Sequence, residues 1–268
     1  MTTRKEFNDI VHGLRDYLEL HRTGTAGHWM KHERRKKEQK VVPSGSPERS
    51  VPVRKAEKTP MTLEAIREEL GECRRCALGK SRIKLVYGVG NPKACVMLIG
   101  EGPGYQEDRQ GEPFVGPAGK LLDKILESIG LSRQKVDPDW KWVYITNIVK
   151  CHPMTDPTNP DARGNDRPPL PEESDTCLPF LLRQIKAIGP TFIVTLGASA
   201  AKTLLPTTQG IMGIRGKWVD WTREDVGPIR LIPTYHPAAL LRNPNWKKDV
   251  WEDMKKLRDE LHKLHPSS

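Results

Sequence analysis

Residues 95–104 read CVMLIGEGPG, an apolar run that stops at three closely spaced glycines. Three further apolar, β-branched runs follow at 142–148, 191–196 and 229–233. Because apolar residues fill both faces of each run, the pattern predicts strands of a parallel sheet that is covered on both sides. Helical patterns separate the runs, so the predicted fold class is α/β: a three-layer α/β/α sandwich with a central four-stranded parallel sheet.

The helical segments between these runs carry recognisable ends. Thr62 is placed to cap a helix that ends near Gly71, and Gly130 and Gly189 each follow a helical pattern, as C-terminal glycines do. The other predicted helices span about 117–129, 173–188, 198–205 and 245–264.

Charge and composition divide the chain into an extension and one domain. Of the 268 residues, 36% are hydrophobic, which is enough to bury a core, and the formal net charge is +10. Residues 1–60 hold 14 basic and 8 acidic residues, so most of the excess charge lies there. We expect residues 1–60 to be a basic, largely disordered extension with a short helix over 4–20. It is either a solvated tail or a non-specific contact with DNA or RNA. Residues 61–268 form the predicted domain.

Secretion and membrane insertion are not expected. No apolar run approaches the roughly 18 residues of a spanning helix, and no apolar signal core follows the N-terminus. Five cysteines are too few for a disulfide scaffold, and their odd number favours a reducing compartment and a metal site. A cytoplasmic location is therefore expected.

Four of the five cysteines are spaced as metal ligands. Cys73 and Cys76 form a CxxC motif ahead of the first strand, Cys151 follows the second strand, and Cys177 lies in the next helix. Four thiolates suit either zinc or an iron–sulfur cluster, and the spacing does not choose between them. The signature of the zinc deaminases is absent. Cys95 lies within an apolar strand and is interpreted as a core residue.

Polar residues follow the predicted strands, where ligands bind in such sheets. Glu101, Glu107 and Asp108 come after the first strand, Asn147 ends the second, and His236 follows the fourth. The glycines lack the spacing of a dinucleotide-binding motif or a P-loop. Carboxylates in a pocket can order and deprotonate a water or stabilise a developing cation, although Asp108 also suits a helix cap or turn.

Phe114 lies in a loop between Pro113 and Gly116, just ahead of a predicted helix. An aromatic residue in such a loop is either a platform for stacking a base or a packing residue. The sequence alone leaves both open.

Four motifs and the cysteines carry a resemblance to a known family. GEGPGYQED at 100–108, GEPFVGPAGKLL at 111–122, YITNIVKCHP at 144–153 and HPAALLRNP at 236–244 resemble the family-4 uracil-DNA glycosylases. The resemblance covers about residues 67–262 in consistent order. It implies a [4Fe–4S] cluster on Cys73, Cys76, Cys151 and Cys177, and the four-stranded α/β/α sandwich of the superfamily.

The resemblance also implies a role for each pocket residue. Releasing uracil from DNA requires the base to be flipped out, gripped and released as an anion. Phe114 matches the residue that stacks on the base. Asn147 matches the amide that reads the N3–H and O4 edge, and His236 matches the donor to O2. Each has a plainer alternative: Asn147 as a strand-end cap and His236 as a satisfied loop histidine.

The remaining matched residues concern water and DNA. Glu101, Gly102 and Glu107 match the water-activating loop, with Glu107 the first choice for positioning the attacking water and Glu101 the second. In the segment after His236, Leu240 or Leu241 is expected to fill the gap left by the flipped nucleotide, unless both are core residues. Arg242 is placed to meet a backbone phosphate.

One loop departs from the family pattern. The run between Cys151 and Cys177 is longer than usual. Asn165 best matches the family asparagine near the active site, with Asn159 a poor second. Residues 153–176 contain no histidine. Because the relatives that become trapped on DNA carry one in this loop, we expect no covalent trapping here.

The predicted function is therefore that of a monofunctional uracil-DNA glycosylase in base excision repair, monomeric and acting on DNA that contains uracil. Water is the expected nucleophile, because no lysine occupies a motif position suited to a Schiff base. Two alternatives stay open. One is a cluster-containing protein that binds or senses DNA with little turnover. The other is a glycosylase for hypoxanthine or xanthine.

Overall fold

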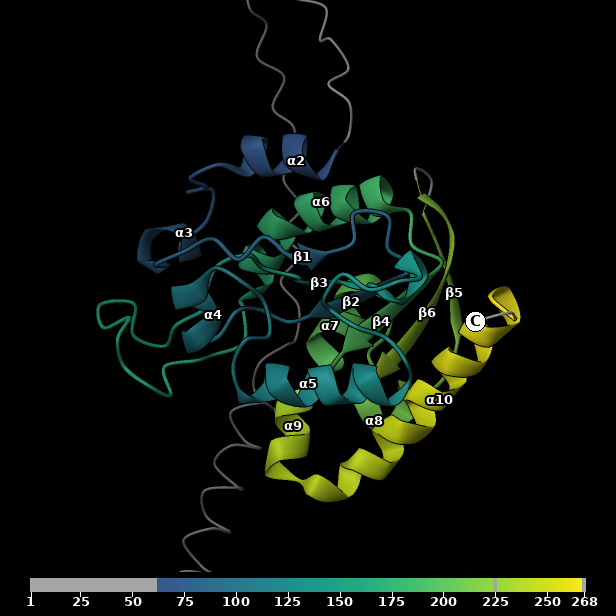
Figure 1. Ribbon diagram of the computed structural model, residues 1–268. Coiled ribbons are helices and arrows are strands. Elements are labelled where there is room, and N and C mark those ends of the chain that lie inside the picture. The colour runs from purple at the N-terminus through teal and green to yellow at the C-terminus, as the bar shows by residue number, and fades with distance from the viewer. Residues whose placement is uncertain (1–61, 224–225, 267–268) are drawn as a thin grey trace, which may run out of the picture. The chain divides into compact units, whose positions relative to one another are not determined.

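The sheet of the computed structural model has six strands in the order β1-β3-β2-β4-β6-β5 (Figure 1). The structure describes residues 62–223 and 226–266. The strands are β1 (Val89–Gly90), β2 (Val96–Gly100), β3 (Tyr144–Asn147), β4 (Phe192–Leu196), β5 (Val219–Arg223) and β6 (Val226–Thr234). The predicted strands are β2, β3, β4 and β6, and they run parallel as predicted.

The two edge strands were not predicted, so the sheet is wider than the sequence analysis expected. Both β1 and β5 pair antiparallel with their neighbours. Strand β1 has only two residues, and in β5 only Trp221 is buried. Neither segment therefore has the continuous apolar character by which the central strands were found.

The helices are α2 (Leu63–Leu70), α3 (Leu78–Ser81), α4 (Tyr105–Gln110), α5 (Pro117–Ser128), α6 (Pro171–Ile188), α7 (Ala198–Leu204), α8 (Ile211–Ile214), α9 (Pro237–Arg242) and α10 (Lys247–Leu264). Thr62 caps α2 as predicted, accepting a hydrogen bond from the Ala65 N–H, and Gly189 ends α6 in the left-handed conformation. The short helices α3, α4, α8 and α9 were not predicted.

Alternate residues of each central strand face opposite helical layers, which confirms the predicted α/β/α sandwich. In β2, Met97 and Ile99 pack with α2, α6 and α7. Val96 and Leu98 pack with α5, α9 and α10 on the other face. Figure 1 shows α2 and α6 on one side of the sheet and α5 and α9 on the other.

The strand register brings the segments after the strands to one edge of the sheet. Gly100, the last residue of β2, pairs with Asn147, the last residue of β3. On the other side, Leu196 of β4 pairs with Thr234 of β6. Helix α4, the long loop before α6, and α9 therefore all start from the same edge.

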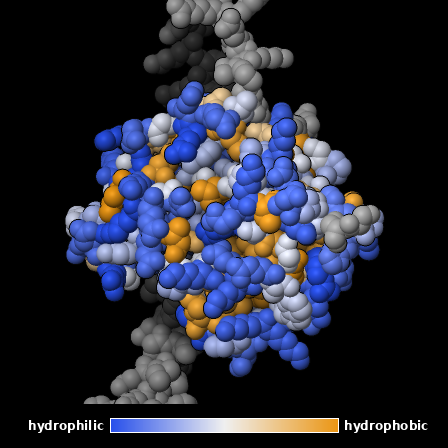
Figure 2. Space-filling view, viewed as in Figure 1, coloured by the Kyte–Doolittle hydropathy of each residue, from blue (hydrophilic) through white to orange (hydrophobic). Residues whose placement is uncertain are grey.

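The surface facing the viewer in Figure 2 is mostly hydrophilic, with apolar residues in small groups. In the part of the chain that the structure describes, no helix is both long and apolar enough to cross a membrane. The predicted extension over residues 1–60, with its helix over 4–20 and its nucleic-acid contact, lies outside the described residues.

Candidate active site

A pocket of about 820 Å³ opens at the carboxyl edge of the sheet. That volume suits a nucleoside-sized ligand. Its walls come from the segment after β2, the loop before α5, the end of β3, the long loop before α6, and α9. Most of the residues predicted from sequence line it: Glu101, Gly102, Glu107, Phe114, Asn147, His236, Leu241 and Arg242.

Asn147 presents an unpaired amide oxygen in this pocket. Its side chain is buried, and Oδ1 has no hydrogen-bond partner. Buried polar atoms are nearly always paired, so a missing partner points to a ligand. Gly100 makes room for this amide, because a Cβ atom there would collide with Asn147 Oδ1 and lie 2.6 Å from Phe114 Cζ. The alternative of Asn147 as a mere strand-end cap does not account for its free oxygen.

Phe114 is held beside Asn147 in a strained conformation. Its φ is +56°, a region that non-glycine residues rarely adopt. The ring is buried and lies 5.4 Å from the His236 ring between centroids. The following backbone is clamped by Glu107, whose Oε1 accepts hydrogen bonds from the Val115 and Gly116 N–H groups at 2.9 and 3.0 Å. These contacts fix the aromatic wall of the pocket.

The acidic segment is helical, although the sequence analysis predicted no helix over these residues. Glu107 lies in the first turn of α4, and its Oε1 holds the Phe114 loop. Glu101 also lines the pocket, and burial raises the pKa of its carboxyl group. Asp108 is fully buried and accepts hydrogen bonds from the Ile83 and Lys84 N–H groups, so its role is structural.

Gly102 leaves room for packing behind the pocket wall. A Cβ atom on it would lie 2.9 Å from Val149 Cγ2 and 3.3 Å from Pro153 Cγ. Pro153 also lines the pocket. Because Gly102 has no side chain, Pro153 can pack directly against it.

His236 is held in one orientation at the start of α9. Its Nδ1 accepts a hydrogen bond from the Ala238 N–H at 3.1 Å. The neutral ring must therefore carry its proton on Nε2, which makes that nitrogen a donor. Burial, aided by the nearby positive charge of Arg242, lowers the pKa of His236 to about 4. The imidazole is thus a neutral donor at physiological pH.

Helix α9 separates the two leucines that the sequence treated as alternatives. Leu240 is 1% exposed and packs in the core beneath α9, so of the two residues only Leu241 stays a candidate for contact with DNA. Leu241 is 49% exposed and lines the pocket. Adjacent helical residues point about 100° apart, which is why one faces the core and the other the opening.

Asn165 does not line the pocket, so its prediction as a substrate contact is not supported. Its side chain is buried inside the long loop. Its Oδ1 accepts from the Asp156 N–H, and its Nδ2 donates to the main-chain oxygens of Asp156 and Asn159. Both polar atoms of the Asn165 amide are therefore hydrogen-bonded to the main chain of the loop.

The four predicted cysteine ligands line a second, small cavity, whose apolar walls include Leu70, Leu78 and Phe180. Arg82 lies 3.5 Å from Cys151 Sγ, and Arg75 lies 3.3 Å from Cys73 Sγ, each through a guanidinium nitrogen. Within residues 62–223 and 226–266, no three His, Cys, Asp or Glu side chains converge closely enough for a single metal ion. Four sulfurs around one apolar cavity, two of them with guanidinium N–H donors, are a ligand set that an iron–sulfur cluster can use. Cys95 is not part of this cavity.

Lys150 links the two cavities, and the sequence analysis did not single it out. Its side chain is fully buried and lines the cysteine cavity. Its Nζ donates to Thr146 Oγ1 at 2.7 Å and to the main-chain oxygen of Asn147 at 2.6 Å. Burial lowers the pKa of Lys150 to about 8. The available sequence signal was a lone charged residue within the apolar run ITNIVKC.

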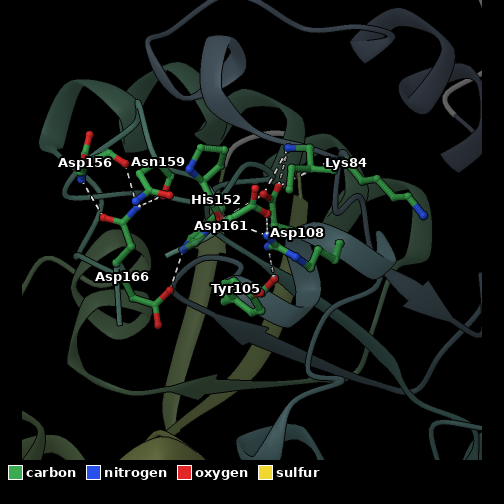
Figure 3. Close-up of polar contacts among 12 residues, drawn as sticks. Lys84, Tyr105, Asp108, His152, Asp156, Asn159, Asp161 and Asp166 are labelled. Carbon is green, nitrogen blue, oxygen red and sulfur yellow. Dashed lines mark hydrogen bonds and ion pairs between the residues drawn. The ribbon is translucent and has the colours of Figure 1, made fainter. Parts of the chain in front are cut away.

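His152 is a second functional candidate that the sequence analysis missed. It is fully buried between Asp108 and Asp166 (Figure 3). Its Nε2 lies 2.6 Å from Asp166 Oδ1, and its Nδ1 lies 3.8 Å from Asp108 Oδ2. Burial by itself would lower the pKa of His152, but the two carboxylates raise it to about 9.

Comparison with known proteins identifies the class that this fold and pocket define. The sequence profile of the uracil DNA glycosylase superfamily matches residues 87–255, a range that spans the whole sheet. Among curated relatives, the type-4 uracil-DNA glycosylase of Sulfurisphaera tokodaii is 42% identical over 74% of this chain and 84% of its own. Those of Archaeoglobus fulgidus and Thermotoga maritima are 39% and 38% identical, over 77% and 75% of this chain and 96% and 95% of their own. The chain belongs to the type-4 uracil-DNA glycosylases.

Proposed function

We propose that this protein hydrolyses the N-glycosidic bond of deoxyuridine in DNA, releasing uracil and leaving an abasic site. The observation that carries the proposal is the unpaired, buried Oδ1 of Asn147 beside the Phe114 ring. An everted uracil stacked on Phe114 would give that oxygen its missing partner through N3–H, while Asn147 Nδ2 would donate to O4. Cytosine offers no N3–H, so the same contact would reject it.

His236 supplies the charge stabilisation that this reaction needs. As the glycosidic bond breaks, its electron pair goes to the base and negative charge builds on O2. The Nε2–H of His236 is free to donate because Nδ1 is occupied by the Ala238 N–H. A neutral donor is suited to the task, since it needs no protonation from solvent at neutral pH.

Glu107 is the proposed base for the attacking water. Its Oε1 is fixed by two main-chain N–H groups, so the position of its Oε2 is fixed as well. A carboxylate held in this way can orient a water toward C1′ and accept its proton. Glu101, whose pKa is raised by burial, is the second candidate.

The rim of the pocket is suited to DNA. Leu241 is exposed beside the opening, where an apolar side chain can occupy the space vacated by the flipped nucleotide. Arg163 and Arg242 also line the pocket and can meet backbone phosphates.

Cys73, Cys76, Cys151 and Cys177 are the proposed ligands of a [4Fe–4S] cluster. Bound there, the cluster would supply structural cross-linking among α6, the segment before α3 and the loop after β3. Lys150, which lines the same cavity, ties this region to the end of β3 that carries Asn147. A brown protein with iron and sulfide in equal amounts is the expected preparation, whereas a colourless, zinc-containing one would contradict the assignment.

The proposed activity is tested with purified full-length protein and an oligonucleotide containing one uracil, treated with alkali after incubation. We expect strand scission at uracil, and loss of at least about two orders of magnitude in rate for Asn147→Asp and His236→Ala. Matched oligonucleotides with hypoxanthine or xanthine test the broader specificity. No scission of single-stranded or U·G substrate by the wild type would reject the proposal.

A further inference from the structure

Asp166 is an acidic residue at the pocket that no motif of the sequence analysis included. It lies in the long loop before α6 and lines the pocket with Glu107. Its side chain is 58% exposed, although one oxygen is tied to the fully buried His152 at 2.6 Å. Figure 3 shows His152 reaching toward Asp166 from one side and toward Asp108 of α4 from the other.

Asp166 and Glu107 approach the same point of the pocket. A Cβ atom placed on Gly104 would lie 3.2 Å from Glu107 Oε2, and 3.6 and 3.8 Å from the two oxygens of Asp166. The two carboxylates therefore flank the space above Gly104. This Glu107 oxygen is the one not bonded to the Phe114 loop.

The loop that carries Asp166 is fixed against α4 at a second place. The Arg109 guanidinium stacks 3.7 Å from the centre of the Tyr105 ring. It also donates to the Pro160 main-chain oxygen, which anchors the loop. Its ion pair with Asp161 adds little to this anchor, because the Asp161 side chain is 83% exposed. The contacts of His152 and those of Arg109 both join the loop to α4. The position of Asp166 relative to Glu107 is therefore set by packed contacts with α4.

We propose that Asp166 is a second catalytic carboxylate of this active site, which acts opposite Glu107 on the attacking water and the reacting sugar, and that His152 is its positioning residue. This inference rests on the proposed glycosylase function. The water oxygen bonds to C1′ as the C1′–N1 bond breaks and its electron pair leaves on uracil. Glu107 takes the water proton, and ionised Asp166 faces the positive charge that develops at C1′.

The electrostatics of Asp166 support this role. The hydrogen bond with His152 holds the pKa of the Asp166 carboxyl below its usual range, so the group is charged at neutral pH. A carboxylate near DNA phosphates weakens ground-state binding. The carboxylate therefore stabilises the complex only in the transition state, when positive charge develops on the sugar.

The test compares Asp166→Asn with Asp161→Asn in the full-length protein. Asp161 lies in the same loop and carries the same charge, but it does not line the pocket. We measure the single-turnover rate on a single-stranded uracil oligonucleotide, and the Kd for the same oligonucleotide carrying non-cleavable 2′-fluoro-deoxyuridine. Asp166→Asn should lower the rate at least about tenfold with unchanged or tighter binding, while Asp161→Asn should stay within about twofold of wild type.

His152→Gln tests the positioning role. It should lower the rate as Asp166→Asn does, and the double variant should be no slower than Asp166→Asn alone, because both changes remove one function. A purely structural His152 would instead add its loss to that of Asp166→Asn. Thermal unfolding shows whether His152→Gln folds, and if it does not, the Asp166→Asn result still decides.

The outcomes separate this inference from the proposed function. A wild-type protein that releases no uracil overturns both. An active wild type with full single-turnover rate in Asp166→Asn overturns only the role of Asp166. Equal losses in Asp166→Asn and Asp161→Asn also overturn it, because loop charge rather than position would then be responsible.

Discussion

The Lys150 ammonium lies 2.6 Å from the main-chain oxygen of Asn147 and has no exposure to solvent. A buried ammonium is costly unless its hydrogen bonds are satisfied, and here Thr146 Oγ1 provides the second acceptor. The same side chain lines the cysteine cavity. One residue thus joins the region of the proposed cluster to the strand end that would read the base.

Lys150→Met keeps most of the side-chain volume but removes both hydrogen bonds. We expect kcat/KM for uracil DNA to fall about tenfold or more, since a charged hydrogen bond contributes about 1.5–3 kcal/mol. Inhibition by free uracil should weaken in parallel, because Asn147 is held less firmly. Lys202→Met on the exposed side of α7 is the control. Unchanged kcat/KM and uracil inhibition in Lys150→Met would contradict the prediction.

Gly100→Ala should displace the side chains that form the floor of the pocket. The new Cβ atom would collide with Asn147 Oδ1 and crowd Phe114 Cζ, so one of these side chains must move. We expect a loss of about 1–3 kcal/mol in unfolding free energy together with most of the activity. Gly210→Ala is the matched control, because a Cβ atom there meets nothing within 4 Å. Urea unfolding and uracil release measure the two effects, and wild-type activity in Gly100→Ala would refute this view of the pocket.

His236 makes stability depend on pH in a definite direction. Its folded pKa of about 4 is below the ordinary value of 6.5, so the unfolded chain binds the proton more readily. The contribution of neutral His236 is complete above about pH 6.5 and is lost as pH falls toward 4. Urea unfolding at pH 4.5, 5.5 and 7 should therefore show a smaller fall in His236→Gln than in wild type. The exposed His262→Gln should behave as wild type, and identical pH profiles for all three proteins would argue against a neutral His236.

Leu240 and Leu241 should fail in different ways when shortened to alanine. Leu240→Ala removes a core side chain and should cost about 2–4 kcal/mol of stability. Leu241→Ala should leave stability nearly unchanged and slow uracil release more on double-stranded than on single-stranded DNA, where no stack needs to be filled. Thermal melts and paired substrates distinguish the two. A greater loss of duplex activity in Leu240→Ala than in Leu241→Ala, at equal stability, would reverse the assignment.

The elements that could be predicted were those with a strong local signal. The central strands are apolar on both faces, and α2 and α6 carry caps or C-terminal glycines, so their sequences predict them directly. Strand β5 has a single buried residue, and α4 has only six residues and directly follows the glycine-rich segment, so neither has a strong local pattern. The edge strands form because a neighbouring strand offers free hydrogen bonds, which is a property of the partner.

The candidate site likewise contains residues that a local pattern predicts and residues that no local pattern predicts. Asn147, Phe114, Glu107 and His236 were predicted because they follow strands or stand in motifs, and they meet in one pocket. Asn165 resembled a family residue by its flanking prolines, yet its amide is used within its own loop. The pairing of His152 with Asp166 joins residues 14 apart through a loop whose path no local pattern reveals.

By itself the sequence determined which segments would be buried strands and which chemical groups would stand at their ends, because apolar periodicity and strand-end position are local properties of the chain. Only the tertiary structure decided which of two adjacent leucines faces solvent, that a lysine would hold the end of β3 that carries Asn147, and that a second carboxylate would face Glu107. Those outcomes depend on which atoms are brought together by packing, and a linear pattern does not contain that information.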